Sequence, residues 1–232
     1  FAADCGVRVF LLGNGTNLLA ADEGLDALVI QMGEGLNRVS LDGETITAEA
    51  GVSLARLGVF AWQHGLTGLE FAHGIPGSLG GGVVMNAGAY GGELKDVLTE
   101  VTALFPDGIR TLRGEELALG YRHSTFTDQP EAVVLRAKLA LTRGDADAIK
   151  ARMEELAVKR RVSQPLELPS AGSTFKRPEG YFAGTLIEQC GLKGMRVGGA
   201  EVSTKHAGFV VNAGGATCAD VLALIEKVQN TV

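Results

Sequence analysis

The stretch GIPGSLGGGVVMNAGAYGGE, residues 74–93, has eight glycines in twenty positions. Because glycine lacks a Cβ, the backbone here can adopt positive φ and approach a ligand closely. Ser78 adds one hydroxyl, and Ile75 and Pro76 add an apolar wall. The stretch therefore predicts a site where main chain reaches a ligand. The alternative interpretation is that the glycines allow tight packing of backbone layers.

A second glycine-rich turn, GNGTNLL at residues 13–19, follows an apolar strand expected at 7–13. Its amides can converge on an oxyanion, although a plain strand-to-loop turn explains the pattern equally well. The turn lacks the third glycine of a Rossmann fingerprint and the Gly-Lys-Ser/Thr ending of a P-loop. Together, the two turns predict a ligand with a pyrophosphate and a flat apolar portion, which describes a dinucleotide or a flavin.

Composition excludes several other classes of protein. The chain has 232 residues, 46% of them hydrophobic, and no apolar run approaches the ~20 residues of a membrane helix. A net charge of −6 argues against a nucleic-acid surface. Cys5, Cys190 and Cys218 lie in no CxxC or Cys/His spacing. They indicate a reduced, cytoplasmic chain with no metal site.

Hydrophobic periodicity predicts an α+β chain in two parts, a larger glycine-rich half and a smaller C-terminal lobe. Ser53 is a plausible helix N-cap, and Asp42-Gly43 suits a hairpin turn. Lys159, Arg160 and Arg161 fall at the C-terminal end of a helix, where cations suit the dipole. We expect strands at 25–31, 132–141 and 209–214, hairpins at 38–51 and 97–117, and helices at 53–65, 145–161, 181–191 and from 218 onward.

The two ends of the chain lead us to expect a fragment of a longer protein. Residues 1–10, FAADCGVRVF, are typical of the last turn of a helix, a stop at Gly6 and then a strand. At the other end, CADVLALIEKVQNTV is an amphipathic helix with no C-terminal cap.

Five stretches taken together resemble one family. They are FLLGNGTNLL, GIPGSLGGGVVMNAGAYGGE, YRHSTF, QPLELPSAGSTFKRPEGYFAGTLIEQCGLKG and VGGAEVSTKHAGFVVNAGGATCADVLALI. In this order they are similar to the bacterial UDP-N-acetylenolpyruvoylglucosamine reductases, the MurB family of cell-wall synthesis, and to its type II branch. The resemblance covers essentially the whole chain. Each motif alone is weak, but five in register are highly specific.

The resemblance implies an FAD-binding domain of the vanillyl-alcohol-oxidase (PCMH) type over residues 1–143. A smaller α+β substrate-binding lobe would follow over residues 144–232. NADPH would reduce FAD, and a hydride from flavin N5 would reach the enolpyruvyl double bond of the substrate, giving UDP-N-acetylmuramate. The implied protein is a cytoplasmic monomer that acts on a small molecule, without nucleic-acid or membrane partners.

The resemblance also implies roles for individual residues. Arg122 matches the family's catalytic arginine in a Tyr-Arg motif, and Ser173 matches its proton donor in a Gly-Ser step. The positions that match FAD contacts are Gly13, Asn14, Gly15, Thr16, Asn17, Leu18, Ile75, Gly77, Ser78, Gly80, Gly81 and Val133. The expected substrate-binding residues are Tyr90, Arg161, Arg177, Lys205, His206 and Asn212.

Two functional segments of the family have no counterpart in residues 1–232. One carries a third catalytic residue, a glutamate, and the other is an N-terminal flavin-contacting Thr-Gly-Gly segment. Two alternatives to the reductase stay open. One is another flavin oxidoreductase on the same FAD fold, and the other is a non-catalytic FAD-binding module.

Overall fold

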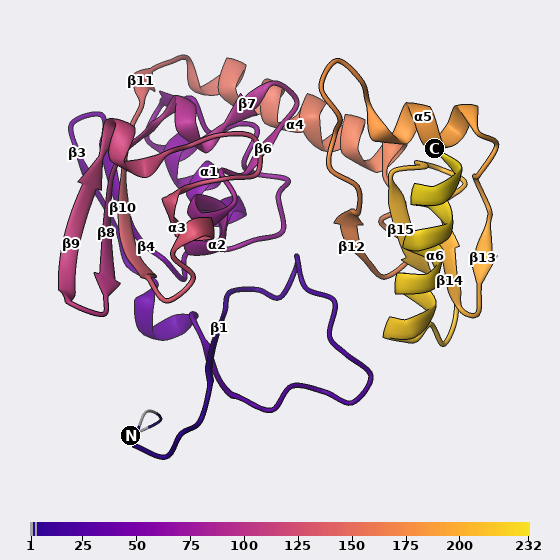
Figure 1. The fold of residues 1–232 in the computed structure, drawn as a ribbon. Helices are drawn as coiled ribbons and strands as arrows, with labels where there is room; N and C mark the ends of the chain where they lie inside the picture. Colours follow the sequence, from indigo (N-terminus) through magenta and orange to yellow (C-terminus); the bar gives the residue numbers. More distant parts are fainter. Residues whose placement is uncertain (1, 3) are drawn as a thin grey trace. The chain divides into compact units, whose positions relative to one another are not determined.

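The computed structural model describes residues 2 and 4–232 (Figure 1). The helix turn expected near the N-terminus includes residues 1 and 3, so that prediction lies partly outside the described residues. The chain divides into two compact units. Unit 1 comprises residues 1–15 and 27–158, and unit 2 comprises residues 16–26 and 159–232. The expected boundary at 143/144 precedes helix α4 (Ala146–Ser163), whereas the division between the units falls inside that helix.

Unit 1 contains a five-stranded antiparallel sheet in the order β3-β4-β10-β8-β9. Both hairpins predicted from the sequence are present: Gly43 has φ +60° in the first turn, and Gly108 has φ +131° in the second. Inward side chains of the central strands alternate with more exposed ones, as a half-buried sheet requires. The strands are β3 (Val39–Asp42), β4 (Thr45–Glu49), β8 (Leu98–Phe105), β9 (Gly108–Arg113) and β10 (Val133–Ala140).

Helices α1 (Leu54–Gln63) and α2 (Leu79–Val84) contribute to the core of unit 1, which also includes Phe126 and Leu156. Helix α1 begins as predicted, because the Ser53 side chain accepts a hydrogen bond from the Arg56 amide. Helix α2 contacts β10 and β4. It lies within the glycine-rich stretch, where the sequence did not predict a helix. The largest fully buried side chains of this core include Ile46, Leu54, Leu57, Leu66, Leu69, Leu79, Leu94, Leu117 and Leu139.

The remaining elements of unit 1 are short. Strands β1 (Val9–Leu12) and β2 (Leu28–Gln31) form a parallel pair with largely exposed side chains. Trp62 of α1 donates its indole N–H to the Ala146 carbonyl at the start of α4, at 3.0 Å. The others are β5 (Leu66–Thr67), β6 (Gly88–Ala89), β7 (Gly92–Glu93), α3 (Thr125–Asp128), β11 (Thr142–Arg143) and three 3-10 helices at Glu34–Leu36, Leu94–Asp96 and Gly114–Leu117.

Unit 2 is a four-stranded sheet in the order β12-β15-β14-β13 with two helices. Its core contains Ile187, Leu192, Val202, Val210 and Leu224. The elements are β12 (Ser170–Ser173), α5 (Ala183–Gln189), β13 (Arg196–Val197), β14 (Ala200–Val202), β15 (Phe209–Asn212) and α6 (Cys218–Thr231). Both expected helices and the 209–214 strand are present, whereas β12, β13 and β14 were not predicted.

The segment of residues 16–26 belongs to unit 2, where Asp22 contacts the start of α6. Asp22 accepts hydrogen bonds from the amides of Cys218 and Ala219, at 2.6 and 3.0 Å, in the first turn of α6. A negative charge is favoured there because helix N-termini carry unsatisfied N–H groups and the positive end of the dipole. Within the described residues, no helix is both long and apolar enough to cross a lipid bilayer.

Candidate active site

The loop after β1, residues 13–18, presents a row of backbone amides. Gly15 has φ +68°, which turns the chain sharply. Residues 14–18 are exposed, and none of their amides donates a hydrogen bond to another described residue. Amides left open along a glycine turn form a concave anion-binding surface. The loop therefore fits the pyrophosphate of a dinucleotide such as FAD.

This loop meets the glycine-rich stretch at one point. A Cβ added to Gly13 would lie 2.5 Å from the Ser78 Oγ, closer than any ordinary contact. Ser78 is only 2% exposed and caps α2 by accepting a hydrogen bond from the Gly81 amide at 3.4 Å. Within unit 1, the start of the first turn at Gly13 thus lies beside Ser78 of the glycine-rich stretch. The Ser78 hydroxyl is directed at the helix end and not at the surface.

The glycines of α2 serve packing as well as ligand access. Gly80 donates its amide to the Ala50 carbonyl at 2.8 Å, and an added Cβ would lie 3.0 Å from the Ala50 Cβ. At Gly82 the added atom would lie 3.1 Å from Leu94 and 3.2 Å from Leu54. Gly81, in contrast, is exposed. Tight backbone packing therefore accounts for Gly80 and Gly82, and Gly81 remains open to a ligand.

The other expected flavin positions are partly accessible. Ile75 is half-buried against the core, and Gly77 is half-buried beside the β-bridge from Ser53 to Ser78. Val133 is half-buried at the start of β10, opposite Leu104 of β8. No group of three or more His, Cys, Asp or Glu side chains in residues 2 and 4–232 is arranged to hold a metal ion.

Arg122 lies in a tight turn between Gly120 and His123. These two residues exchange backbone hydrogen bonds of 3.1 and 3.2 Å, and Arg122 itself has φ +54°. The arginine is half-buried, and its Nη2 donates to the Gly88 carbonyl at 3.1 Å. Its guanidinium carbon lies 5.3 Å from the Tyr121 ring centroid. One hydrogen bond and the Tyr121 ring therefore orient the guanidinium, and its other N–H groups donate to no other described residue.

Tyr90 is at the tip of the β6–β7 hairpin. Its φ of +55° and that of Gly91, +89°, are the pair that a two-residue type I′ turn requires. Arg122 contacts Gly88 in the same hairpin. Arg122 therefore contacts the hairpin that carries Tyr90.

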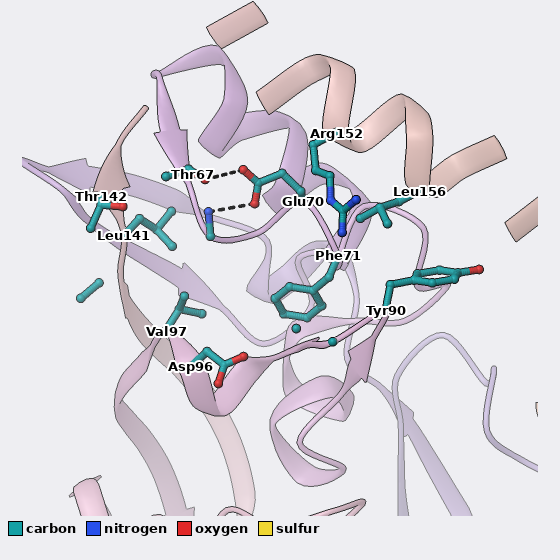
Figure 2. A pocket seen from close by; sticks show the side chains of 14 residues that line it. Thr67, Glu70, Phe71, Tyr90, Asp96, Val97, Leu141, Thr142, Arg152 and Leu156 are labelled. Carbon is teal, nitrogen blue, oxygen red and sulfur yellow. Dashed lines mark hydrogen bonds between the residues drawn. The ribbon is translucent and has the colours of Figure 1, made fainter. Parts of the chain in front are cut away.

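A cavity of about 520 Å³ opens beside this hairpin within unit 1, and Tyr90 lies at its rim (Figure 2). The Glu70 carboxylate in it accepts hydrogen bonds from the Thr67 hydroxyl at 2.6 Å and the Gly68 amide at 2.9 Å. Glu70 and Asp96 give the lining two carboxylates against the one guanidinium of Arg152. That charge suits a diphosphate poorly, and none of the expected flavin residues lines this cavity.

Ser173 of unit 2 is an exposed residue at the end of β12, opposite Phe209 of β15. Its hydroxyl forms no hydrogen bond with another described residue. A Cβ added to Gly208 would lie 3.3 Å from the Ser173 Oγ and 3.1 Å from the His206 ring. Ser173 and His206 therefore flank the same glycine. The His206 Nδ1 accepts the Gly208 amide at 3.1 Å, so the proton of a neutral ring lies on Nε2.

The other expected substrate residues of unit 2 differ in solvent exposure and in the bonds that their side chains already make. The Lys205 Nζ donates to the Arg161 carbonyl at 2.8 Å and pairs with Glu167 at 3.5 Å. The Asn212 side chain accepts the amides of Gly214 and Ala216, so it shapes a loop. Arg161 and Arg177 are exposed, and the Arg177 guanidinium carbon lies 5.3 Å from the Phe182 ring centroid.

Comparison with known proteins gives two family matches. Residues 1–113 match an FAD binding domain, and residues 164–232 match the C-terminal domain of UDP-N-acetylenolpyruvoylglucosamine reductase. Curated relatives bear the name UDP-N-acetylenolpyruvoylglucosamine reductase. That of Syntrophomonas wolfei is 54% identical, over 96% of this chain and 75% of the relative. That of Geobacillus kaustophilus is 51% identical, over 98% of this chain and 74% of the relative.

A solved structure agrees with the sequence matches. The crystal structure of UDP-N-acetylenolpyruvylglucosamine reductase (MurB) from Thermus caldophilus superposes with a TM-score of 0.89 at 40% identity. It covers 97% of this chain and 82% of that one. The expected fold class and the expected FAD cofactor are therefore confirmed.

Proposed function

This chain belongs to the UDP-N-acetylenolpyruvoylglucosamine reductase family of oxidoreductases, and on that basis we propose that it reduces UDP-N-acetylenolpyruvoylglucosamine to UDP-N-acetylmuramate in peptidoglycan precursor synthesis. The observation that carries the proposal is the family match over residues 164–232. An FAD domain alone would fit many oxidoreductases, but the C-terminal match favours this substrate over that of another flavin oxidoreductase.

We propose that the loop of residues 13–18 binds the pyrophosphate of FAD and that Gly81, Ile75, Gly77 and Val133 lie along the rest of the cofactor. The open amides of the loop and the exposure of Gly81 support this assignment. When bound and reduced by NADPH, FAD supplies the hydride for the substrate double bond. The remaining catalytic work falls to side chains of the protein.

Arg122 is the group that we propose to stabilise developing charge. Hydride addition to one alkene carbon leaves negative charge on the other, and this charge spreads into the adjacent carboxylate. A fixed cation aimed at that carboxylate stabilises the charge where it develops. Because Arg122 is half-buried and oriented by the Gly88 carbonyl, its guanidinium costs little further ordering on binding.

Ser173 is the proposed proton donor. A serine hydroxyl is a feeble acid, so it donates a proton only to a strong base held in contact. The carbon next to the substrate carboxylate becomes such a base once the hydride has been added. The exposed Ser173 hydroxyl, which makes no hydrogen bond to another described residue, is available for this transfer. We propose that His206, on the other side of Gly208, contacts the substrate near the same point.

We further propose that residues 1–143 form the cofactor domain and residues 144–232 the substrate-binding lobe of a monomeric cytoplasmic enzyme. Arg161, Arg177 and Lys205 would supply positive charge to the diphosphate of the substrate, with Tyr90 and Asn212 as polar contacts. The three cysteines are free, which agrees with a reducing compartment.

The test is an anaerobic absorbance experiment on the purified protein with FAD. We expect the flavin bands to bleach when NADPH is added and to return when UDP-N-acetylenolpyruvoylglucosamine follows. UDP-N-acetylglucosamine, which lacks the enolpyruvyl group, should leave the flavin bleached. Bands that stay bleached with the enolpyruvyl sugar, in protein that carries the family's C-terminal glutamate segment, binds FAD and is reduced by NADPH, would refute the proposed substrate.

A further inference from the structure

Asn86 is a polar residue with no exposed surface, at the point where the glycine-rich stretch leaves α2. Its φ is +40°, in the left-handed region that asparagine tolerates better than most residues with a side chain. Its amide donates to the Val83 carbonyl at 3.2 Å and thereby ends the helix. The backbone therefore directs the Asn86 side chain away from α2.

The Asn86 side chain makes three of the four hydrogen bonds that an asparagine can make. The Asn86 Nδ2 donates to the Glu93 Oε2 and to the Gly120 carbonyl, both at 3.0 Å. Its Oδ1 accepts the Lys95 amide at 2.9 Å. An asparagine side chain has two donor hydrogens and two acceptor lone pairs. Asn86 thus joins the end of α2 to the hairpin of Tyr90 and to the turn of Arg122.

The Arg122 turn is held from its other side by Ser124. This serine is also fully buried, and its Oγ donates to the Val84 carbonyl at 2.7 Å. The turn from Gly120 to His123 is therefore fixed at both ends by groups in the last residues of the α2 region. The hydrogen bond from Arg122 to Gly88 is a third contact that fixes this turn.

We propose that Asn86 and Ser124 are positioning residues that fix the turn carrying Arg122 relative to α2. The inference rests on the proposed role of Arg122 toward the substrate. Neither residue touches the reacting atoms; each acts by limiting where the guanidinium can lie. Because misplacement of a catalytic group by about 1 Å costs on the order of 10²-fold in rate, two buried contacts at the base of the turn affect the reaction strongly.

The test measures flavin reduction by NADPH and flavin oxidation by the enolpyruvyl sugar separately in Asn86→Gly. Glycine suits the positive φ of residue 86, so the substitution removes the side-chain hydrogen bonds without adding backbone strain. We expect oxidation of the reduced flavin by the enolpyruvyl sugar to slow about 10- to 100-fold, with flavin reduction by NADPH within twofold of the parent. In cofactor-free protein, hydrogen exchange at the Gly120 and His123 amides should become faster.

Thr102→Val is the matched control. Thr102 is a buried polar residue of unit 1, 7% exposed, that bonds to the Thr111 hydroxyl and to Arg136, away from the Arg122 turn. Its loss should lower the thermal stability while leaving both half-reactions and the Gly120 and His123 exchange unchanged. If Asn86→Gly fails to fold, Ser124→Ala releases the same turn from Val84 and should show the same division between half-reactions.

Two results overturn the proposal. One is a folded Asn86→Gly or Ser124→Ala protein with parental rates of flavin oxidation. The other is equal slowing of both half-reactions, which would make these residues supports of the fold only. If the enolpyruvyl sugar fails to oxidise a parent protein that carries the family's C-terminal glutamate segment, the proposed function is wrong, and the exchange at Gly120 and His123 still decides whether Asn86 holds the turn.

Discussion

The contact between Gly13 and Ser78 gives a prediction with a defined magnitude. In Gly13→Ala, the new methyl group would lie 2.5 Å from the Ser78 Oγ, so one of the two must move. Gly13 does not have a positive φ, so alanine adds no backbone strain. The cheapest relief is rotation of the Ser78 side chain, which then loses its hydrogen bond to the Gly81 amide. The expected cost is therefore that of a lost helix cap and of a buried hydroxyl without a partner.

Loss of a serine N-cap costs about 0.5–2 kcal/mol, and a buried polar group left unpaired costs about 1–3 kcal/mol. We therefore expect Gly13→Ala to lower the free energy of unfolding by about 1–3 kcal/mol. In a Ser78→Ala background the nearest atom is the residue 78 Cβ at 3.6 Å, an ordinary contact. There the same substitution should cost close to zero.

The assay is a double-mutant cycle by urea unfolding of the cofactor-free protein, with an FAD titration of each variant. The coupling free energy between positions 13 and 78 should be about 1–3 kcal/mol, and Gly13→Ala should bind FAD more weakly than the parent. Gly35→Ala is the control, because no atom lies within 4 Å of its added Cβ. Additive effects within about 0.5 kcal/mol would show that the Oγ clash is not the cause.

Three further predictions concern catalysis and unit 2. Ser173→Ala should leave flavin reduction by NADPH nearly intact and slow flavin oxidation by the enolpyruvyl sugar ~10²–10⁴-fold; equal slowing of both steps in stopped-flow traces would contradict the role. Asp22→Asn should lower the free energy of unfolding of unit 2 by about 0.5–1 kcal/mol, because one charge-assisted bond to the start of α6 is lost; unchanged amide exchange at Cys218 and Ala219 would argue against this. Backbone hydrogen bonds from Thr217 and then Gly199 hold the pKa of Asp220 below its ordinary value. The stabilisation by Asp220 is therefore complete above the unfolded pKa of about 3.9 and is lost as the pH falls through the lower folded value, so acid unfolding of Asp220→Asn should lack that part of the pH dependence.

Local signals in the sequence predicted most of the larger elements. Ser53 and the Asp42-Gly43 pair act on neighbouring backbone, so the helix and the hairpin that they mark are present. Helix α2 was not predicted because its sequence, LGGGVV, contains three poor helix formers. It forms through the Ser78 cap and through packing that only glycine permits against Ala50 and Leu54.

The proposed site residues came from local motifs, whereas the long-range contacts that hold them could not be predicted. The glycine loops stand out by composition, whereas Arg122 and Ser173 were proposed only because they match motifs of the family. Asn86 does not stand out in MNAGAY, because its role depends on Gly120, 34 positions later. Such long-range contacts leave no periodic pattern, although an asparagine flanked by glycine-rich turns is a signal for left-handed backbone. The short strands β13 and β14 were missed because two or three residues give too little alternation.

Trp62 is an intrinsic fluorescent probe of unit 1. It is the single tryptophan of the chain, and its indole contacts the first residue of α4. Emission from this ring therefore responds to the attachment of α4 to α1 in unit 1, whereas far-ultraviolet circular dichroism averages over the helices of both units. If the two signals have different midpoints in one urea titration, the units unfold as separate cooperative blocks. Their stabilities can then be read one at a time from the unmodified chain.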